Sequence, residues 1–228
     1  DNGIGVAAEL AILASDDIEH GPIECLFTVD EETGLTGARA LEKGFMTGDI
    51  LLNLDSEDEG EIFMGCAGGK DTQAVFHYEP RDTNPNMQYF KIEVKGLNGG
   101  HSGGEIHKGL GNANKILVRY LLKNQADFNL CFIHGGNLRN AIAREAQATI
   151  GLYPEEKEAA RILLNHFTAD IENELKHVDP NVQITMASTD RPDKYISDYD
   201  AEKLILALHA CPHGVIGMSH DIEGLVET

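Results

Sequence analysis

Basic residues are scarce in this sequence, and so are long apolar runs. The 228 residues include 18 Lys and Arg against 38 Asp and Glu, which gives a formal net charge of −20 and a pI near 4.7. A chain this acidic is not expected to bind nucleic acid or an anionic membrane surface. No apolar stretch reaches the roughly 18 residues that a membrane-spanning helix needs. The remaining composition, 42% hydrophobic and 25% charged, is that of a globular protein.

Cysteine is also sparse, with four residues and no CxxC pair. Without such a pair, we do not expect a zinc knuckle or a thioredoxin-like site. Cys25 and Cys131 lie inside apolar runs, which is typical of reduced core cysteines, and we therefore expect a cytoplasmic protein. The sequence begins DNGIGVA without a methionine and stops at GLVET, so we expect it to be a piece of a longer protein.

The first third of the chain alternates helical and strand-like patterns. Residues 4–15 have Ala and Leu at helical spacing, and residues 33–44 suggest a short helix closed by a glycine. Apolar runs at 23–29, 49–55 and 61–69 are typical of buried strands. The pattern predicts an α/β layer built on a mainly parallel sheet.

The pattern changes after Gly68–Gly69, where we place a domain boundary between residues 1–69 and 70–228. Residues 71–80 and 87–97 alternate apolar and polar side chains, as half-exposed antiparallel strands do. The order that follows is β-α-β-β-α-β, the ferredoxin-like arrangement, with a further helix at its end. The strands are expected at 88–96, 129–134, 146–153 and 181–187, and the helices at 109–123, 155–177 and 200–211.

Three carboxylates follow one of the apolar runs in the stretch TVDEETG, as Asp30, Glu31 and Glu32. A second run ends in Asp55, and Asp1 precedes a glycine-rich turn. Parallel strands lie about 4.8 Å apart and bind ligands beyond their carboxyl ends, so these acids could meet at one divalent cation. One glutamate could then bind metal while its neighbour acts as a general base. The alternative is that the acids cap strand ends and enter solvated turns.

Two further stretches contain residues that could take part in chemistry. His101 lies in GLNGGHSGG, where glycines allow the backbone to approach a ligand closely. It could bind metal, donate to a developing oxyanion, or lie unused at the surface. In GGNLRNAIAREA, Asn140 could hold a carbonyl oxygen and Arg144 could clamp a carboxylate, or both could belong to a polar turn. The sequence has no GxSxG motif, P-loop or Rossmann fingerprint.

Taken together, these motifs resemble the M20 metallopeptidase family, and in particular its aminoacyl-histidine (Xaa-His) dipeptidase branch. The resemblance runs from the first residue to the last. Its segments, in family order, are DNGIGVA, LFTVDEETGLTGA, NLDSEDEGEIFMGCAGG, GLNGGHSGGEIHKG, GGNLRNAIAREA and PHGVIGMSHDIEGLVET.

The resemblance implies part of a catalytic domain with two Zn²⁺ ions, for which Co²⁺ or Mn²⁺ are alternatives. Asp1 matches the aspartate that bridges the metals, and Glu32 and Asp55 match ligands of one metal each. Glu31 matches the general base that activates the attacking water, with Asp30 in a supporting role. The family's His-x-Asp motif and its last metal histidine have no match in this sequence, so we expect the chain alone to bind metal poorly and to be inactive.

The resemblance also implies that residues 70–228 form an incomplete lid or dimerisation domain. His101 matches the lid histidine that polarises the scissile carbonyl, Asn140 matches a substrate contact, and Arg144 is a candidate contact for the free carboxylate. Ala143 stands where the family usually has proline, a departure that weakens the assignments of Asn140 and Arg144.

The function expected from this resemblance is metal-dependent hydrolysis of small dipeptides, with Xaa-His dipeptides as the expected substrates and a homodimer as the assembly. Two alternatives stay open. One is another M20 amidohydrolase, such as a tripeptidase, deacylase or carboxypeptidase. The other is that the fragment is a non-catalytic lid or association module.

Overall fold

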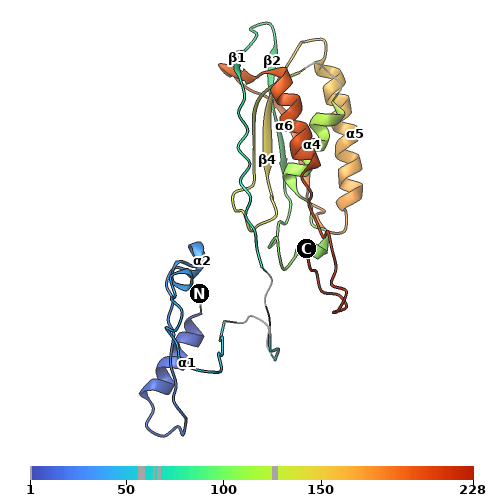
Figure 1. Ribbon diagram of the computed structural model, residues 1–228. Coiled ribbons are helices and arrows are strands. Elements are labelled where there is room, and N and C mark those ends of the chain that lie inside the picture. Colours follow the sequence, from blue (N-terminus) through green and yellow to red (C-terminus); the bar gives the residue numbers. More distant parts are fainter. Residues whose placement is uncertain (1, 56–59, 64, 66–67, 125–127) are drawn as a thin grey trace. The chain divides into compact units, whose positions relative to one another are not determined.

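The computed structural model in Figure 1 describes residues 2–55, 60–63, 65, 68–124 and 128–228. They divide into two compact units, Asp1–Gly68 and Gly69–Thr228. None of the helices in the described ranges is long and apolar enough to cross a membrane.

The first unit opens with the predicted helix, α1 (Gly3–Ala14). Asn2 begins it, because its side-chain oxygen accepts a hydrogen bond from the backbone N–H of Gly5 at 2.9 Å. The predicted helix over 33–44 is wrong in its extent. Two four-residue helices, α2 (Glu31–Gly34) and α3 (Thr36–Arg39), form instead, separated by Leu35 in a left-handed conformation with φ of 56°.

The three strands predicted in this unit are absent from the part of it that the structure describes. The described parts of the apolar runs make no ladder, and most of their described side chains are exposed, as for Ile50 at 83% and Ile62 at 91%, whereas Cys25 and Leu26 are half-buried. An extended segment becomes a strand only when a neighbour supplies hydrogen-bond partners. The parallel sheet predicted here is not seen among the described residues, although the runs are as apolar as buried strands, and residues 64, 66 and 67 of the third run lie outside the described residues.

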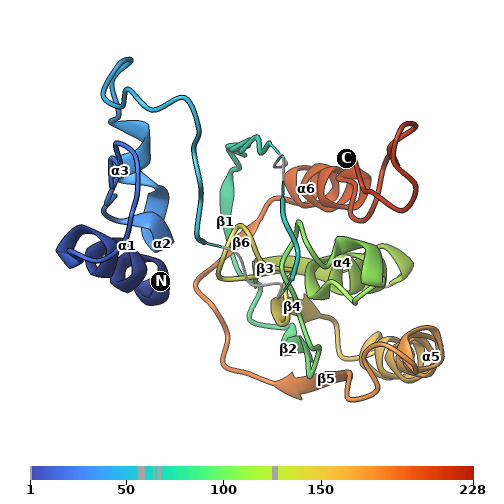
Figure 2. The same cartoon turned by 90° about the horizontal axis from the view of Figure 1, so that it is seen from below.

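The second unit has the predicted ferredoxin-like order. Its strands are β2 (Gln88–Lys95), β3 (Phe128–Gly135), β4 (Ala146–Leu152) and β5 (Gln183–Ser188). They form one antiparallel sheet in the order β3-β4-β2-β5. Figure 2 shows α4 (Ala113–Lys123), α5 (Lys157–Leu175) and α6 (Asp198–Ala210) together on one face of this sheet.

The core lies between the sheet and these helices. Phe90, Ile92 and Val94 alternate along β2 and are buried, as the period of a strand requires when one face is covered. Tyr120 of α4 is fully buried beside Phe167 of α5, with ring centroids 5.8 Å apart. Burial raises the pKa of the Tyr120 hydroxyl to about 12. That hydroxyl donates to the carbonyl of Ala160 at 3.2 Å.

A short two-stranded sheet was not predicted. It pairs β1 (Pro80–Asp82) with β6 (Lys194–Ile196) in antiparallel register. Each strand has only three residues, and one starts at a proline, so neither has a recognisable period. The alternating stretch at 71–80 was predicted as a strand, but only its last residue lies in β1.

Candidate functional site

The acidic motif of the first unit folds into a double turn. Asp30 begins α2 with a left-handed backbone, φ 64°, and its Oδ2 accepts from the Thr36 hydroxyl at 3.0 Å. Glu31 and Glu32 are the first two residues of the helix. The chain then turns back onto Val29, whose carbonyl accepts from Gly37 N–H at 3.0 Å, and a Cβ at Gly37 would lie 2.6 Å from the Val29 nitrogen. The local shape of the motif therefore depends on Gly37, which follows it.

In the part of the chain that the structure describes, the motif and Asp55 do not form a shared metal centre. Asp55 follows an extended, exposed segment, and its N–H donates to the side chain of Asn53 at 3.0 Å. Within the described ranges, no group of three His, Cys, Asp or Glu side chains is placed to hold a metal ion. Asp1 lies outside the described residues. The acids have the right chemistry for a divalent cation, but Glu31, Glu32 and Asp55 do not by themselves form a metal centre.

In the second unit, two stretches that are far apart in the sequence are joined. His101 pairs with Ala141 in an isolated antiparallel bridge. On either side of this pair, the Ser102 N–H donates to the Asn140 carbonyl at 2.9 Å, and the Ile142 N–H donates to the Gly100 carbonyl at 2.8 Å. These bonds bring together His101, which sequence reasoning proposed as a catalytic residue, and Asn140, which it proposed with Arg144 for substrate binding. Both side chains are exposed.

The ring of His101 is oriented by its own loop. Its Nδ1 accepts from the backbone N–H groups of Gly103 and Gly104, each at 3.1 Å. A ring nitrogen that accepts two hydrogen bonds carries no proton, so the neutral imidazole has its proton on Nε2. The Nε2–H is therefore the donor that this ring can offer to a ligand oxygen.

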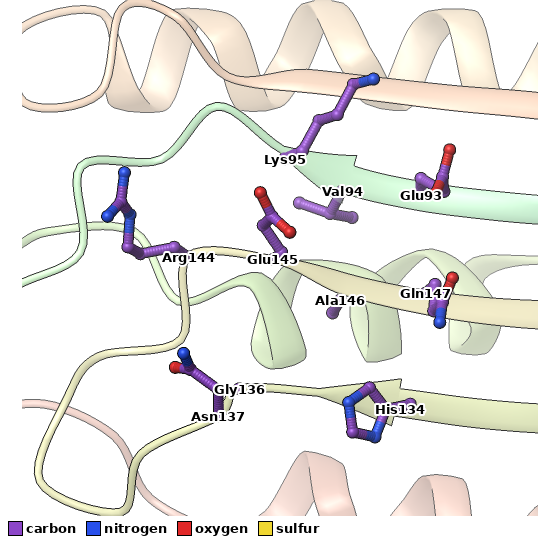
Figure 3. A pocket seen from close by; sticks show the side chains of 10 residues that line it. All are labelled: Glu93, Val94, Lys95, His134, Gly136, Asn137, Arg144, Glu145, Ala146 and Gln147. Atoms are coloured by element: carbon purple, nitrogen blue, oxygen red, sulfur yellow. The ribbon is translucent and has the colours of Figure 1, made fainter.

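Arg144 lies beside a shallow hollow of about 420 Å³ on the sheet. The hollow is lined by Glu93, Val94, Lys95, His134, Gly136, Asn137, Arg144, Glu145, Ala146 and Gln147, and Figure 3 shows them on β2, β3 and β4 and on the loop that joins β3 to β4. The Arg144 Nε donates to the Leu97 carbonyl at 3.4 Å. Its stem packs against Gly99, where a Cβ would lie 2.3 Å from the Arg144 Cγ. Asn140 is not among the residues that line this hollow.

Sequence reasoning missed two acids that hold the His101 loop. Glu105 accepts from the His101 N–H at 2.8 Å through Oε2, and its Oε1 is 2.7 Å from the Lys108 ammonium, which lowers the Glu105 pKa. The four-residue spacing between His101 and Glu105 could have indicated this pair. Asp179, fully buried after α5, accepts from the N–H groups of Asn98 and Gly111. It lies 78 residues from His101 along the chain, and no local pattern predicts it.

Comparison with known proteins identifies a family domain within the second unit. Residues 92–179 match the family described as the peptidase dimerisation domain of M20 peptidases. This range contains His101, Asn140 and Arg144, and ends at Asp179.

The whole chain is similar to particular dipeptidases. It is 44% identical over 230 aligned residues to the cytosol non-specific dipeptidase of Escherichia coli, covering 100% of this chain and 47% of that protein. The crystal structure of aminoacylhistidine dipeptidase from Vibrio alginolyticus matches with a TM-score of 0.79 and 43% identity, over 99% of this chain and 46% of that one. A 70-residue stretch is 42% identical to the uncharacterized protein YqjE of Bacillus subtilis. The chain spans about half the length of the two dipeptidases it matches.

The family resemblance predicted from the motifs is therefore confirmed. The chain has an M20 dimerisation domain and is similar to dipeptidases over its whole length. Its mixed α/β architecture matches that of a dipeptidase structure.

Proposed function

We propose that this chain is part of a metal-dependent dipeptidase, in which Gly69–Thr228 is the lid and dimerisation unit. The observation that supports this best is the pairing of His101 with the Asn140 segment, together with the Nε2–H form of the His101 ring. Both features follow from hydrogen bonds within the second unit. The dipeptidase names of the similar proteins support the same class of reaction.

In the proposed mechanism, Glu31 acts as the general base. Its carboxylate takes a proton from the attacking water and passes it to the leaving amine. Glu32, Asp55 and Asp1 would hold two Zn²⁺ ions, and a bound divalent cation supplies an attacking water of lowered pKa. Because the described residues form no metal centre alone, further ligands would have to come from other parts of a longer protein.

His101 and Asn140 would act on the substrate carbonyl. The Nε2–H of His101 would donate to the oxygen as negative charge develops there, and the Asn140 amide would hold the same group in place. Removing one such donor typically slows an enzyme by about 10²–10³-fold. Arg144 lines the hollow while its Nε donates to the Leu97 carbonyl, and we propose that its guanidinium binds the free carboxylate of the dipeptide.

The proposed substrates are small dipeptides, with Xaa-His peptides among them. The names of the two similar proteins differ on this point, since one is called non-specific and the other is an aminoacylhistidine dipeptidase. A tripeptidase, deacylase or carboxypeptidase would require a longer or differently blocked substrate. We further propose a homodimer, on the basis of the dimerisation domain, and a cytoplasmic location like that given in the E. coli protein's name.

The test is a substrate panel with the full-length protein and with this 228-residue chain, each assayed for zinc content. The panel should contain β-alanyl-histidine, other Xaa-His dipeptides, dipeptides without histidine, tripeptides and N-acyl amino acids. We expect the full-length protein to bind about two zinc ions per chain and to cleave dipeptides far faster than tripeptides or acyl compounds. A full-length protein that binds no zinc, or that cleaves only acyl compounds, would contradict the proposal.

A further inference from the structure

A buried carboxylate holds both ends of the loop that contains His101. Asp179 is 0% exposed, and its Oδ1 accepts from the Asn98 N–H at 2.6 Å while its Oδ2 accepts from the Gly111 N–H at 2.7 Å. His101 lies three residues after the first of these amides. One side chain therefore connects the start and the end of the loop to the turn after α5.

The backbones at the base of this loop are in close contact with the same turn. A Cβ at Gly96 would lie 2.1 Å from the Asn181 carbonyl oxygen. A Cβ at Gly111 would lie 2.9 Å from the Leu175 Cδ1. The Asn98 side chain also donates to the Val178 carbonyl at 2.6 Å. The loop is thus seated on the turn by packing as well as by the carboxylate.

We propose that Asp179 is a positioning residue for His101. By fixing residues 98 and 111, it keeps the loop in the conformation in which Gly103 and Gly104 donate to Nδ1 and the ring proton stays on Nε2. Hydrogen bonds to an ionised acceptor are about twice as strong as neutral ones, which suits a carboxylate to this task. The proposal rests on the proposed function only for its catalytic consequence.

The competing explanation is that Asp179 merely stabilises the fold. Two variants separate these roles. Asp179→Ala removes both hydrogen-bond acceptors. Asp179→Asn keeps one carbonyl oxygen, so it should keep part of the positioning of the His101 loop. Leu164→Ala is the matched control, because Leu164 is buried in the core from α5 and its loss destabilises the unit without removing a bond to the loop.

The primary measurement is ¹⁵N NMR of the His101 ring in the 228-residue chain at a pH where the ring is neutral. The wild-type and Leu164→Ala proteins should both show one tautomer, with the proton on Nε2. Asp179→Ala should show averaged tautomers and at least tenfold faster amide exchange at Gly103 and Gly104, and Asp179→Asn should lie between. Should Asp179→Ala fail to fold, the comparison of Asp179→Asn with Leu164→Ala decides the question.

The proposal is overturned if a folded Asp179 variant keeps the wild-type His101 signals, or if Leu164→Ala alters them equally. Turnover by the full-length protein tests the consequence separately. Asp179→Asn should lower kcat at least tenfold, and it should have little further effect when His101 is already replaced by alanine. If His101→Ala alone leaves turnover unchanged, the proposed function fails, while the NMR result still decides whether Asp179 positions the ring.

Discussion

Replacing Gly99 by alanine should show how tightly the loop base packs on Arg144. Gly99 has φ of +68°, and a Cβ there would lie 2.3 Å from the Arg144 Cγ, 2.7 Å from its Cδ and 3.3 Å from the Ile142 carbonyl oxygen. Gly109, in the same loop, has φ of +67° and nothing within 4 Å of its would-be Cβ. The two glycines differ in contacts but not in backbone strain, so Gly109→Ala is a matched control.

The left-handed backbone should cost both variants about 1 kcal/mol. The contact adds a second cost at Gly99 only, because the Arg144 stem must move out of a packed position. Overpacking typically costs about 1–3 kcal/mol, and a flexible side chain should bring it to the lower half of that range. We therefore expect Gly99→Ala to be about 1–2 kcal/mol less stable than Gly109→Ala.

Tyrosine fluorescence during urea unfolding suits this measurement. The chain has no tryptophan and six tyrosines, all of them in the Gly69–Thr228 unit, so the signal reports on that unit. The six are Tyr78, Tyr89, Tyr120, Tyr153, Tyr195 and Tyr199.

An Arg144→Ala background completes the comparison between the two glycine variants. Arg144→Ala removes the Cγ and Cδ that the new methyl would meet and leaves only the 3.3 Å contact with the Ile142 carbonyl oxygen, so most of the difference between the glycine variants should be lost there. Equal stability of Gly99→Ala and Gly109→Ala in the wild-type background would contradict this prediction. So would a difference that is undiminished without the arginine side chain.

Three further predictions concern the second unit. Tyr120→Phe should lower the free energy of unfolding by about 1 kcal/mol at neutral pH, because the hydrogen bond to the Ala160 carbonyl is lost. Burial raises the pKa of Tyr120 in the folded protein to about 12, so the contribution of this tyrosine to wild-type stability should be complete below pH 10 and fall as pH rises toward 12. Urea titrations at several pH values would show both effects. Lys115→Met should cost about 1–2 kcal/mol by thermal unfolding, since the ammonium contacts three carbonyls at the end of α6. Arg119→Lys should cost only about 0.5 kcal/mol, and less in high salt, because its two 2.8 Å bonds to Glu174 lie at the surface.

The ferredoxin-like unit could be predicted from sequence because its signals are local. From Phe90 to Val94, β2 alternates buried and half-buried side chains, and α5 keeps its buried residues on one face. Each strand also finds its neighbours within the same unit. The two three-residue strands β1 and β6 were missed because a period cannot be recognised over three residues.

The first unit could not be predicted in the same way. Its apolar runs resemble strands in composition, but a strand also needs a neighbouring segment that pairs with it through backbone hydrogen bonds. The described residues of this unit form no such pair of strands. The expected meeting of Glu31 and Asp55 at a shared sheet edge depended on that sheet. Without it, Glu31 begins a short helix and Asp55 follows an exposed segment.

The sequence indicated which residues could belong to the candidate site, but not which of them lie close together in the fold. Glycines around His101 indicated a loop able to approach a ligand, yet nothing local showed that it would pair with the Asn140 segment. The pairing joins two loops that are far apart in the sequence. One loop connects β2 to α4 and contains His101, and the other connects β3 to β4 and contains Asn140. Asp179 was beyond reach for the same reason, since its partners lie 68 and 81 residues away.

The proposed function depends most on the hydrolysis of dipeptides with Glu31 as the base. The most direct test is turnover of β-alanyl-histidine by the full-length protein and by Glu31→Gln, each assayed for zinc, with Glu32→Gln as the neighbouring control. Glu31→Gln should keep its zinc and lose turnover by about 10²–10⁴-fold, whereas Glu32→Gln should lose zinc as well. Near-normal turnover by zinc-loaded Glu31→Gln would contradict the role of Glu31 as the general base.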